Sequence, residues 1–255
     1  MKANFFLLMV ACCTLHLSSA QKKTFEGIVY SKTSFPNHPY DGILKQIDFT
    51  KNNIDEQFNA LKHPVNDELA KAAANDPQAG AEQMYRMALV LMPVRTTTMF
   101  TPQKSFTQMT ALGYEWHVLI DENEKKGRIF LQSHNGNEKG TINFPTSELK
   151  KIWEKEEVGE YAGEYSIKPS AEIAVIAGYP VKKMTYIFSG TSQGPVATSK
   201  IISTIPWKIT VWYNDALDPR INIQNSFYFK LDKAVLKTEV EFDKEGKKKV
   251  LYEVT

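Results

Sequence analysis

Short stretches in which apolar and polar residues alternate recur over most of the chain, which is typical of half-buried β-strands. The first stretch, 25–30, predicts a strand with Ile28 and Tyr30 on one face and Gly27 and Val29 on the other. Further strands are predicted at 96–101, 115–120, 128–132, 141–144, 161–168, 172–177, 181–188, 208–213, 226–231, 235–242 and 250–254. Turns rich in Gly, Asn and charged residues separate several of them, and the turn at 242–249 predicts a terminal hairpin.

A helical period appears mainly in one region, 65–92. Asp76 and Pro77 form a helix start, and the stripe that follows carries Met84, Met87 and Leu91. The last turn of this helix is apolar all round, so other elements must cover it on more than one side. We therefore expect a helical insert at about 64–95, with shorter helices at 54–61 and 147–156.

These patterns predict an α+β fold that is mainly β. We expect residues 21–255 to form a single β-rich domain, built on one large antiparallel sheet of nine to eleven strands. A sheet of that size tends to curl. The expected architecture is a half-barrel that wraps the helical insert.

The N-terminus predicts export. Lys2 precedes an apolar run from Phe5 to Leu17, and small residues end the segment at Ala20. Residues 1–20 are therefore expected to be a signal peptide cleaved after Ala20, which would place the protein in the periplasm or outside the cell. Both cysteines lie in this segment, and the alternative is an earlier cut that leaves Cys12 or Cys13 as a lipid-anchored N-terminus.

The charge and the motifs of the chain limit the kinds of partner and cofactor that we expect. The 31 Lys+Arg against 29 Asp+Glu leave a net charge of +2, so we expect no nucleic-acid partner. The segments after residue 20 are too short and polar to predict a transmembrane helix. A chain without cysteine after residue 20, and without a spaced histidine pair or a phosphate-binding glycine loop, predicts no metal site and no cofactor.

Two patterns were weighed as catalytic. Residues 190–194 match G-x-S-x-G, but Pro195 follows and the last histidine is His134, so a turn is the better interpretation. The acidic pairs are Asp215 with Asp218 and Asp121 with Glu122, all in predicted turns. A glycosidase needs two carboxylates about 5–10 Å apart, whereas Asp in such a segment more simply builds the turn. We expect no catalytic residue.

Aromatic and methionine side chains are the remaining candidates for binding. Met84, Met87, Leu91, Trp116 and Trp212 are expected to line an apolar hollow, because Met adapts to irregular apolar ligands and Trp offers a large apolar area. The alternative for each is an ordinary place in the core.

Three segments also carry a family resemblance: Phe25–Tyr30, Ile176–Tyr186 and Thr210–Leu217. Their order resembles the exported Bacteroidetes proteins of domain of unknown function 4412 and the related GLPGLI proteins, which are distantly like the lipoprotein carriers LolA and LolB. The resemblance implies an envelope protein whose curved sheet shelters an acyl chain, with no catalytic residues to transfer. The chain departs from the pattern in its helical region and in Val181, which stands where the family turn has cysteine.

The hypothesis from the sequence is a non-enzymatic envelope protein that binds a hydrophobic small molecule, a lipid or a lipoprotein acyl chain. Two alternatives stay open. The chain could be a structural or protein-interaction module, or a glycan hydrolase that uses carboxylates the sequence does not identify.

Overall fold

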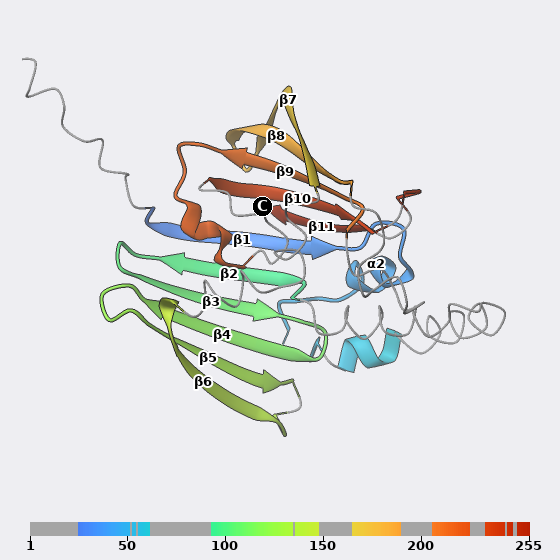
Figure 1. Cartoon of the computed structure of the whole chain (residues 1–255). Coiled ribbons are helices and arrows are strands. Elements are labelled where there is room, and N and C mark those ends of the chain that lie inside the picture. Colours follow the sequence, from blue (N-terminus) through green and yellow to red (C-terminus); the bar gives the residue numbers. More distant parts are fainter. Residues whose placement is uncertain are drawn as a thin grey trace, which may run out of the picture.

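A computed structural model describes residues 25–51, 53–54, 56–61, 93–134, 136–147, 165–189, 206–224, 233–242, 244–246 and 249–255. Its centre is one open, curved antiparallel sheet of eleven strands (Figure 1). The strands are β1 (Gly27–Ser34), β2 (Arg95–Phe100), β3 (Lys104–Thr110), β4 (Tyr114–Asp121), β5 (Lys126–Ser133), β6 (Lys139–Pro145), β7 (Tyr165–Ile176), β8 (Tyr179–Phe188), β9 (Lys208–Asn214), β10 (Ala234–Glu241) and β11 (Lys249–Val254). The helical elements are α2 (Pro39–Leu44), the 3-10 helix η3 (Pro219–Gln224) and a helical segment within 54–61.

The order of strands in space places the first strand in the middle of the sheet. From edge to edge the order is β6-β5-β4-β3-β2-β1-β11-β10-β9-β8-β7. Each half is a meander of neighbouring hairpins, and β1 joins the halves by pairing with β2 on one side and β11 on the other. The first strand therefore lies beside the last strand of the chain.

The alternation predicted for β1 is confirmed. Ile28 and Tyr30 are 51% and 52% exposed, whereas Ser31 on the opposite face is buried. Strand pairing carries this division across the sheet, because residues directly opposite each other point to the same face. In the middle of the sheet one face is thus largely covered, and we refer to it as the buried face; the other we call the open face. The edge strands β6 and β7 are mostly exposed on both faces.

The main core forms where the short helices meet the buried face. Ile43 and Leu44 of α2, with Phe58 of the 54–61 helix, cluster with Ile209 and Val211 of β9. Towards β1–β3 the buried face instead carries small hydroxyl side chains: Ser31, Thr96, Thr98, Ser105 and Thr107. The Thr98 and Thr107 hydroxyls lie 3.2 Å apart and hydrogen-bond each other across the strands.

The sequence predicted most strands within a few residues, and the structure corrects three points. The strand β3 was not predicted, because its alternation is between hydroxyl and polar residues as much as apolar ones. The helix α2 was also missed. The two strands expected at 161–168 and 172–177 are one strand, β7, with an irregularity between Pro169 and Ile173. The terminal hairpin is confirmed by the pairing of β10 with β11.

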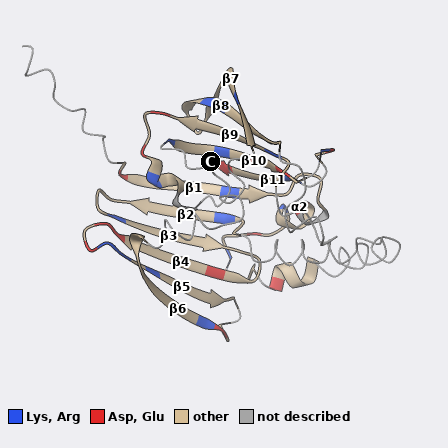
Figure 2. Ribbon diagram, in the orientation of Figure 1, with Lys and Arg blue, Asp and Glu red and all other residues tan. Residues whose placement is uncertain are grey.

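Several predictions concern residues outside the described part of the chain. These are the signal peptide at 1–20, nearly all of the helical insert at 64–95, the strand at 226–231 and most of the helix at 147–156. Within the described residues, no helix is long and apolar enough to cross a membrane. Positive and negative side chains are interspersed over the elements drawn in Figure 2.

Candidate functional site

A gap between two strands near the middle of the sheet forms the candidate site. The strand β11 pairs with β1 only from Ser31 to Ser34, and with β10 only from Lys237 to Glu241. Both neighbours extend further, so residues 27–30 pair with β2 alone, and residues 234–235 with β9 alone. Among the described residues, the facing stretches of β1 and β10 beside Thr255, whose N–H donates to the Tyr30 carbonyl at 2.9 Å, therefore border a slot in the sheet.

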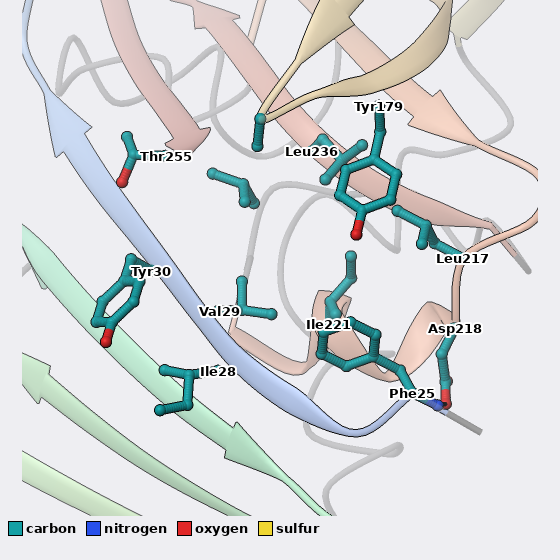
Figure 3. Close-up of a pocket in the computed structure, with 12 residues that line it drawn as sticks. Phe25, Ile28, Val29, Tyr30, Tyr179, Leu217, Asp218, Ile221, Leu236 and Thr255 are labelled. Atoms are coloured by element: carbon teal, nitrogen blue, oxygen red, sulfur yellow. Dashed lines mark hydrogen bonds between the residues drawn. The ribbon is translucent and has the colours of Figure 1, made fainter.

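A pocket of about 180 Å³ lies at this slot (Figure 3), and we call it the β1–β10 pocket. Apolar side chains dominate its lining, with Tyr179 contributing a hydroxyl that points towards Ile221 in Figure 3. The lining residues are Phe25, Ile28, Val29, Tyr30, Ala177, Tyr179, Leu217, Asp218, Ile221, Leu236, Val254 and Thr255. They come from β1 and the residues before it, from β10, from the end of β11, from the β7–β8 turn with the start of β8, and from η3 with the segment before it.

A β-bulge in β10 supplies one wall. Val235 pairs with Tyr213 and Lys237 pairs with Trp212, which leaves Leu236 as the extra residue. A bulge interrupts the strict in–out alternation of a strand. As a result the consecutive residues Val235 and Leu236 are both buried, at 1% and 2% exposure, and Leu236 can face the pocket.

The helix η3 closes the β10 side of the slot through Asn222. The Asn222 side-chain amide donates to the Lys233 carbonyl at 2.6 Å, and its oxygen accepts from the Val235 N–H at 2.8 Å. Both backbone groups lie before Lys237, the first residue of β10 that pairs with β11. A buried side chain thus satisfies the free edge of β10, whereas the facing residues of β1 border the pocket.

A charged pair holds the entrance together. The Asp218 carboxylate accepts hydrogen bonds from the Phe25 N–H at 3.2 Å, the Arg220 N–H at 2.9 Å and the Arg220 Nε at 2.8 Å. The Arg220 guanidinium also donates to the carbonyls of Phe25, Thr101 and Pro102. The pair therefore links η3 to the start of β1 and to the β2–β3 turn.

The surroundings of Asp218 shift its pKa. Burial alone would raise the pKa of this carboxyl, but the hydrogen bonds from the Arg220 and Phe25 backbone and from the Arg220 side chain outweigh burial and lower it. Asp215, nearby in the chain, accepts from both Lys182 and Lys233 at 2.7 Å, and these contacts lower its pKa as well. Both carboxylates are committed to ion pairs.

In the segment 214–220, side-chain oxygens accept hydrogen bonds from nearby backbone N–H groups, as expected for a turn. The Asn214 oxygen accepts the N–H groups of Ala216 and Leu217, and Asp218 accepts that of Arg220 two residues on. Asp121 does the same for Asn123 and Glu124 in the β4–β5 turn.

Of the histidines, His134 binds the Ala111 carbonyl at 2.8 Å, and His117 lies between the rings of Phe106 and Phe130. No group of three metal-ligating side chains occurs among the described residues.

Two of the five residues expected to line an apolar hollow, Trp116 and Trp212, lie on opposite faces of the sheet. Met84, Met87 and Leu91 lie outside the described residues. Trp116 shares the buried face of the sheet with Met109, its partner on β3, and its indole Nε1 is buried without a hydrogen-bond partner. Trp212 points to the open face, where the Lys237 and Lys183 ammonium groups lie 4.8 and 5.6 Å from its ring centroid. In the part of the chain that the structure describes, neither indole lines the β1–β10 pocket.

Sequence reasoning missed most of the residues that line the pocket; Tyr179 was among the aromatic residues considered for binding. Leu236 becomes a wall residue only through the bulge, and Val254 only through the pairing of β11 with β1. Leu217 and Ile221 flank an Asp-Pro pair that was correctly interpreted as a turn, but a turn pattern does not reveal that two apolar side chains on it are covered.

The comparisons with known proteins add little to this geometry. No protein-family model and no curated protein matches the chain. Two solved structures of PNGF-II, in the C2 and P21 space groups, are similar to it at 18% and 16% identity, with TM-scores of 0.31 and 0.24. They cover 63% and 62% of this chain, which spans about a quarter of theirs, at 24% and 25%. At these TM-scores the likeness supports no argument about fold or function.

Proposed function

We propose that this protein is a non-enzymatic binding protein that takes an apolar group into the β1–β10 pocket. The observation that carries the proposal is the slot itself: a preformed, mainly apolar pocket between strands that are otherwise hydrogen-bonded. Binding proteins commonly use apolar pockets with a few polar groups that fix orientation. Here the Tyr179 hydroxyl and the unpaired stretch of β1 could supply those polar contacts.

The size of the pocket limits what enters it. An apolar cavity of about 150 Å³ holds one benzene molecule, so a pocket of 180 Å³ accepts the end of an acyl chain or one large apolar side chain. Burying about 100 Å² of apolar ligand surface would contribute about 2.5 kcal/mol. A complete lipid would therefore keep most of its length outside this pocket.

Several expectations from the sequence belong to this proposal. Export through residues 1–20, or lipid anchoring at Cys12 or Cys13, would place the pocket where acyl chains and lipoproteins occur. The resemblance to LolA-like carriers supports an acyl ligand in the same way.

The experiment is an NMR titration with decanoate, in which the methyl signals of Val29, Leu217 and Leu236 report on the pocket. We expect saturable shifts of these signals. Leu217→Trp, which fills the pocket from its partly exposed side, should weaken binding about tenfold or more, equivalent to about 1.4 kcal/mol. Leu119→Trp adds the same side chain on the open face and should leave binding unchanged.

Two results would reject the apolar ligand: pocket methyl signals that do not move with decanoate, or equal binding by the Leu217→Trp variant. Retention of the dispersed amide spectrum shows that each variant is folded.

One observation favours a second candidate, a protein-interaction module. Ile28, Tyr30, Met99 and Leu119 are 51%, 52%, 45% and 44% exposed, and pairing across β1–β4 places all four on the open face. Exposed apolar side chains grouped in this way mark many protein-interaction surfaces.

A further inference from the structure

A second hollow, with a different chemical lining, lies where β3 ends, β4 begins and β5 ends. It has a volume of about 250 Å³ and lies between the segment around Phe49 and the strands β3, β4 and β5. Its lining differs from that of the β1–β10 pocket, because amides, hydroxyls and a carboxylate predominate: Gln108, Thr110, Glu115, Gln132 and Ser133. The two sites have no lining residue in common.

Strand register arranges these polar groups in a row. Thr110 pairs with Glu115, and Glu115 pairs with Gln132, so the three side chains lie side by side on the open face. The Gln108 side-chain amide donates to the Glu115 carboxylate and holds it in place. Because neighbouring strands lie about 4.8 Å apart, a ligand that crosses the strands meets a new polar group at each one.

The same row continues into an adjoining hollow. Thr110 pairs with Arg95, Arg95 with Lys32, and Lys32 with Glu253. Arg95, Lys32 and Glu253 line a hollow of about 380 Å³, and the Phe49 ring lines this hollow and the first one. The Arg95 guanidinium packs on that ring, 5.0 Å from its centroid. We call the two hollows together the Phe49 groove.

The chemistry of the groove favours a ligand with many hydroxyl groups. Amide side chains both donate and accept, carboxylates accept, and hydroxyls do either, so together they match groups that also donate and accept. Charges along the groove are largely paired internally: Lys51 lies 3.7 Å from Asp48, Lys45 lies 2.7 Å from Asp41 and Lys32 lies 3.6 Å from Glu253. A simple ion would gain little from such a lining.

We propose that the Phe49 groove binds a short oligosaccharide laid across the strands from β5 towards β11. Gln132, Glu115 and Thr110 hydrogen-bond the sugar hydroxyls. Phe49, whose ring carries the Arg95 guanidinium on one face, adds apolar contact with the part of its ring that lines the groove. The elongated shape requires a chain of several sugars rather than a single one. This inference is independent of the apolar ligand proposed above.

The test is a titration of the full chain with four probes: cellohexaose, maltohexaose, chitohexaose and hexagalacturonic acid. We expect at least one probe to shift the side-chain amide signals of Gln108 and Gln132 in a saturable way. Gln132→Ala and Phe49→Ala should each weaken that binding about tenfold or more. Gln103→Ala makes the same change in the distant β2–β3 turn and should bind normally.

The proposal is overturned if none of the four probes moves these signals, or if Gln132→Ala binds as tightly as the unmodified chain. Thr110→Val, which keeps the shape and removes one hydroxyl, provides a second variant should Phe49→Ala fail to fold. Decanoate binding is expected to be unchanged in Gln132→Ala, so failure of one site leaves the other measurable.

Discussion

The ion pair between Asp218 and Arg220 is hydrogen-bonded to segments that are far away in the sequence. Both side chains are mostly buried, at 10% and 18% exposure, and their hydrogen bonds reach β1 and the β2–β3 turn. An exposed pair such as Lys126 with Glu124, whose atoms lie 3.6 Å apart, makes no such links. Desolvated and multiply hydrogen-bonded pairs are costly to break, whereas exposed pairs contribute little.

We expect Asp218→Asn to lower the free energy of unfolding by about 1–3 kcal/mol, because Arg220 loses its charged partner. The loss should depend on pH. The fold holds the pKa of Asp218 below the ordinary 3.8, so the stabilisation is fully present above that value and disappears as the pH falls through the lowered pKa. Urea unfolding at neutral and acidic pH measures both effects.

The control for Asp218→Asn is Glu124→Gln in the exposed pair, which should change stability by less than about 0.5 kcal/mol. An Asp218→Asn variant equally destabilised at neutral pH and below the lowered pKa would contradict the electrostatic explanation and point to packing instead.

The start of β10 is a strand edge inside the sheet that β11 does not pair with. Free strand edges invite unwanted pairing, and proteins block them with side chains, prolines or bulges. Here the bulge at Leu236 and the Asn222 side chain complete the start of β10 where β11 no longer reaches. At the outer edges, β7 and β6 contain Pro169 and Pro145, residues tolerated mainly on edge strands.

We expect Asn222→Ala to lower the free energy of unfolding by about 2 kcal/mol or more, because it leaves the Val235 N–H and the Lys233 carbonyl without their partner. Hydrogen exchange should show the change locally, with the Val235 amide losing more protection than amides in the middle of β10. Asn143→Ala serves as the control, since Asn143 is exposed and accepts one bond from Arg128. Unchanged protection at Val235 would show that Asn222 does not close this edge.

The strand β1 connects the two halves of the sheet. Among the strands that the structure describes, the half formed by β2–β6 and the half formed by β7–β11 are joined only by the pairings of β1. A cluster of Phe100, Val254 and Tyr252 also packs across this junction. Both halves should therefore unfold together, even though most pairings within each half are local hairpins.

We expect one cooperative thermal transition, and a change in either half should shift it. Gly127→Ala in β5 would place a Cβ 2.1 Å from the Phe144 ring, which should cost about 1–3 kcal/mol through overpacking. Val211→Ala in β9 removes two methyl groups from a fully buried side chain and should cost about 2 kcal/mol. Calorimetry on both variants should show the single transition moved to lower temperature.

The matched control for Gly127→Ala is Gly140→Ala on the neighbouring strand β6, where a Cβ would meet nothing within 4 Å. It should leave the transition nearly unchanged. Two separate transitions, with each variant moving only one of them, would contradict a single folding unit.

Local alternation of apolar and polar residues was enough to predict a mainly β chain, most of its strands and the two faces of β1, because side-chain direction along a strand follows from a period of two. The missed strand β3 and the bulge in β10 mark the limit of this signal, since hydroxyl residues and an extra residue both blur the period. The sequence shows Leu236, Asn222 and Gln132, but it does not show which residues they lie beside. Those neighbours arise from strand order and register, which join β1 to β11, pair β11 with β10 only from Lys237 onward and align Gln132 with Glu115 and Thr110. Such pairings are contacts between residues far apart in the chain, and only the folded sheet decides them.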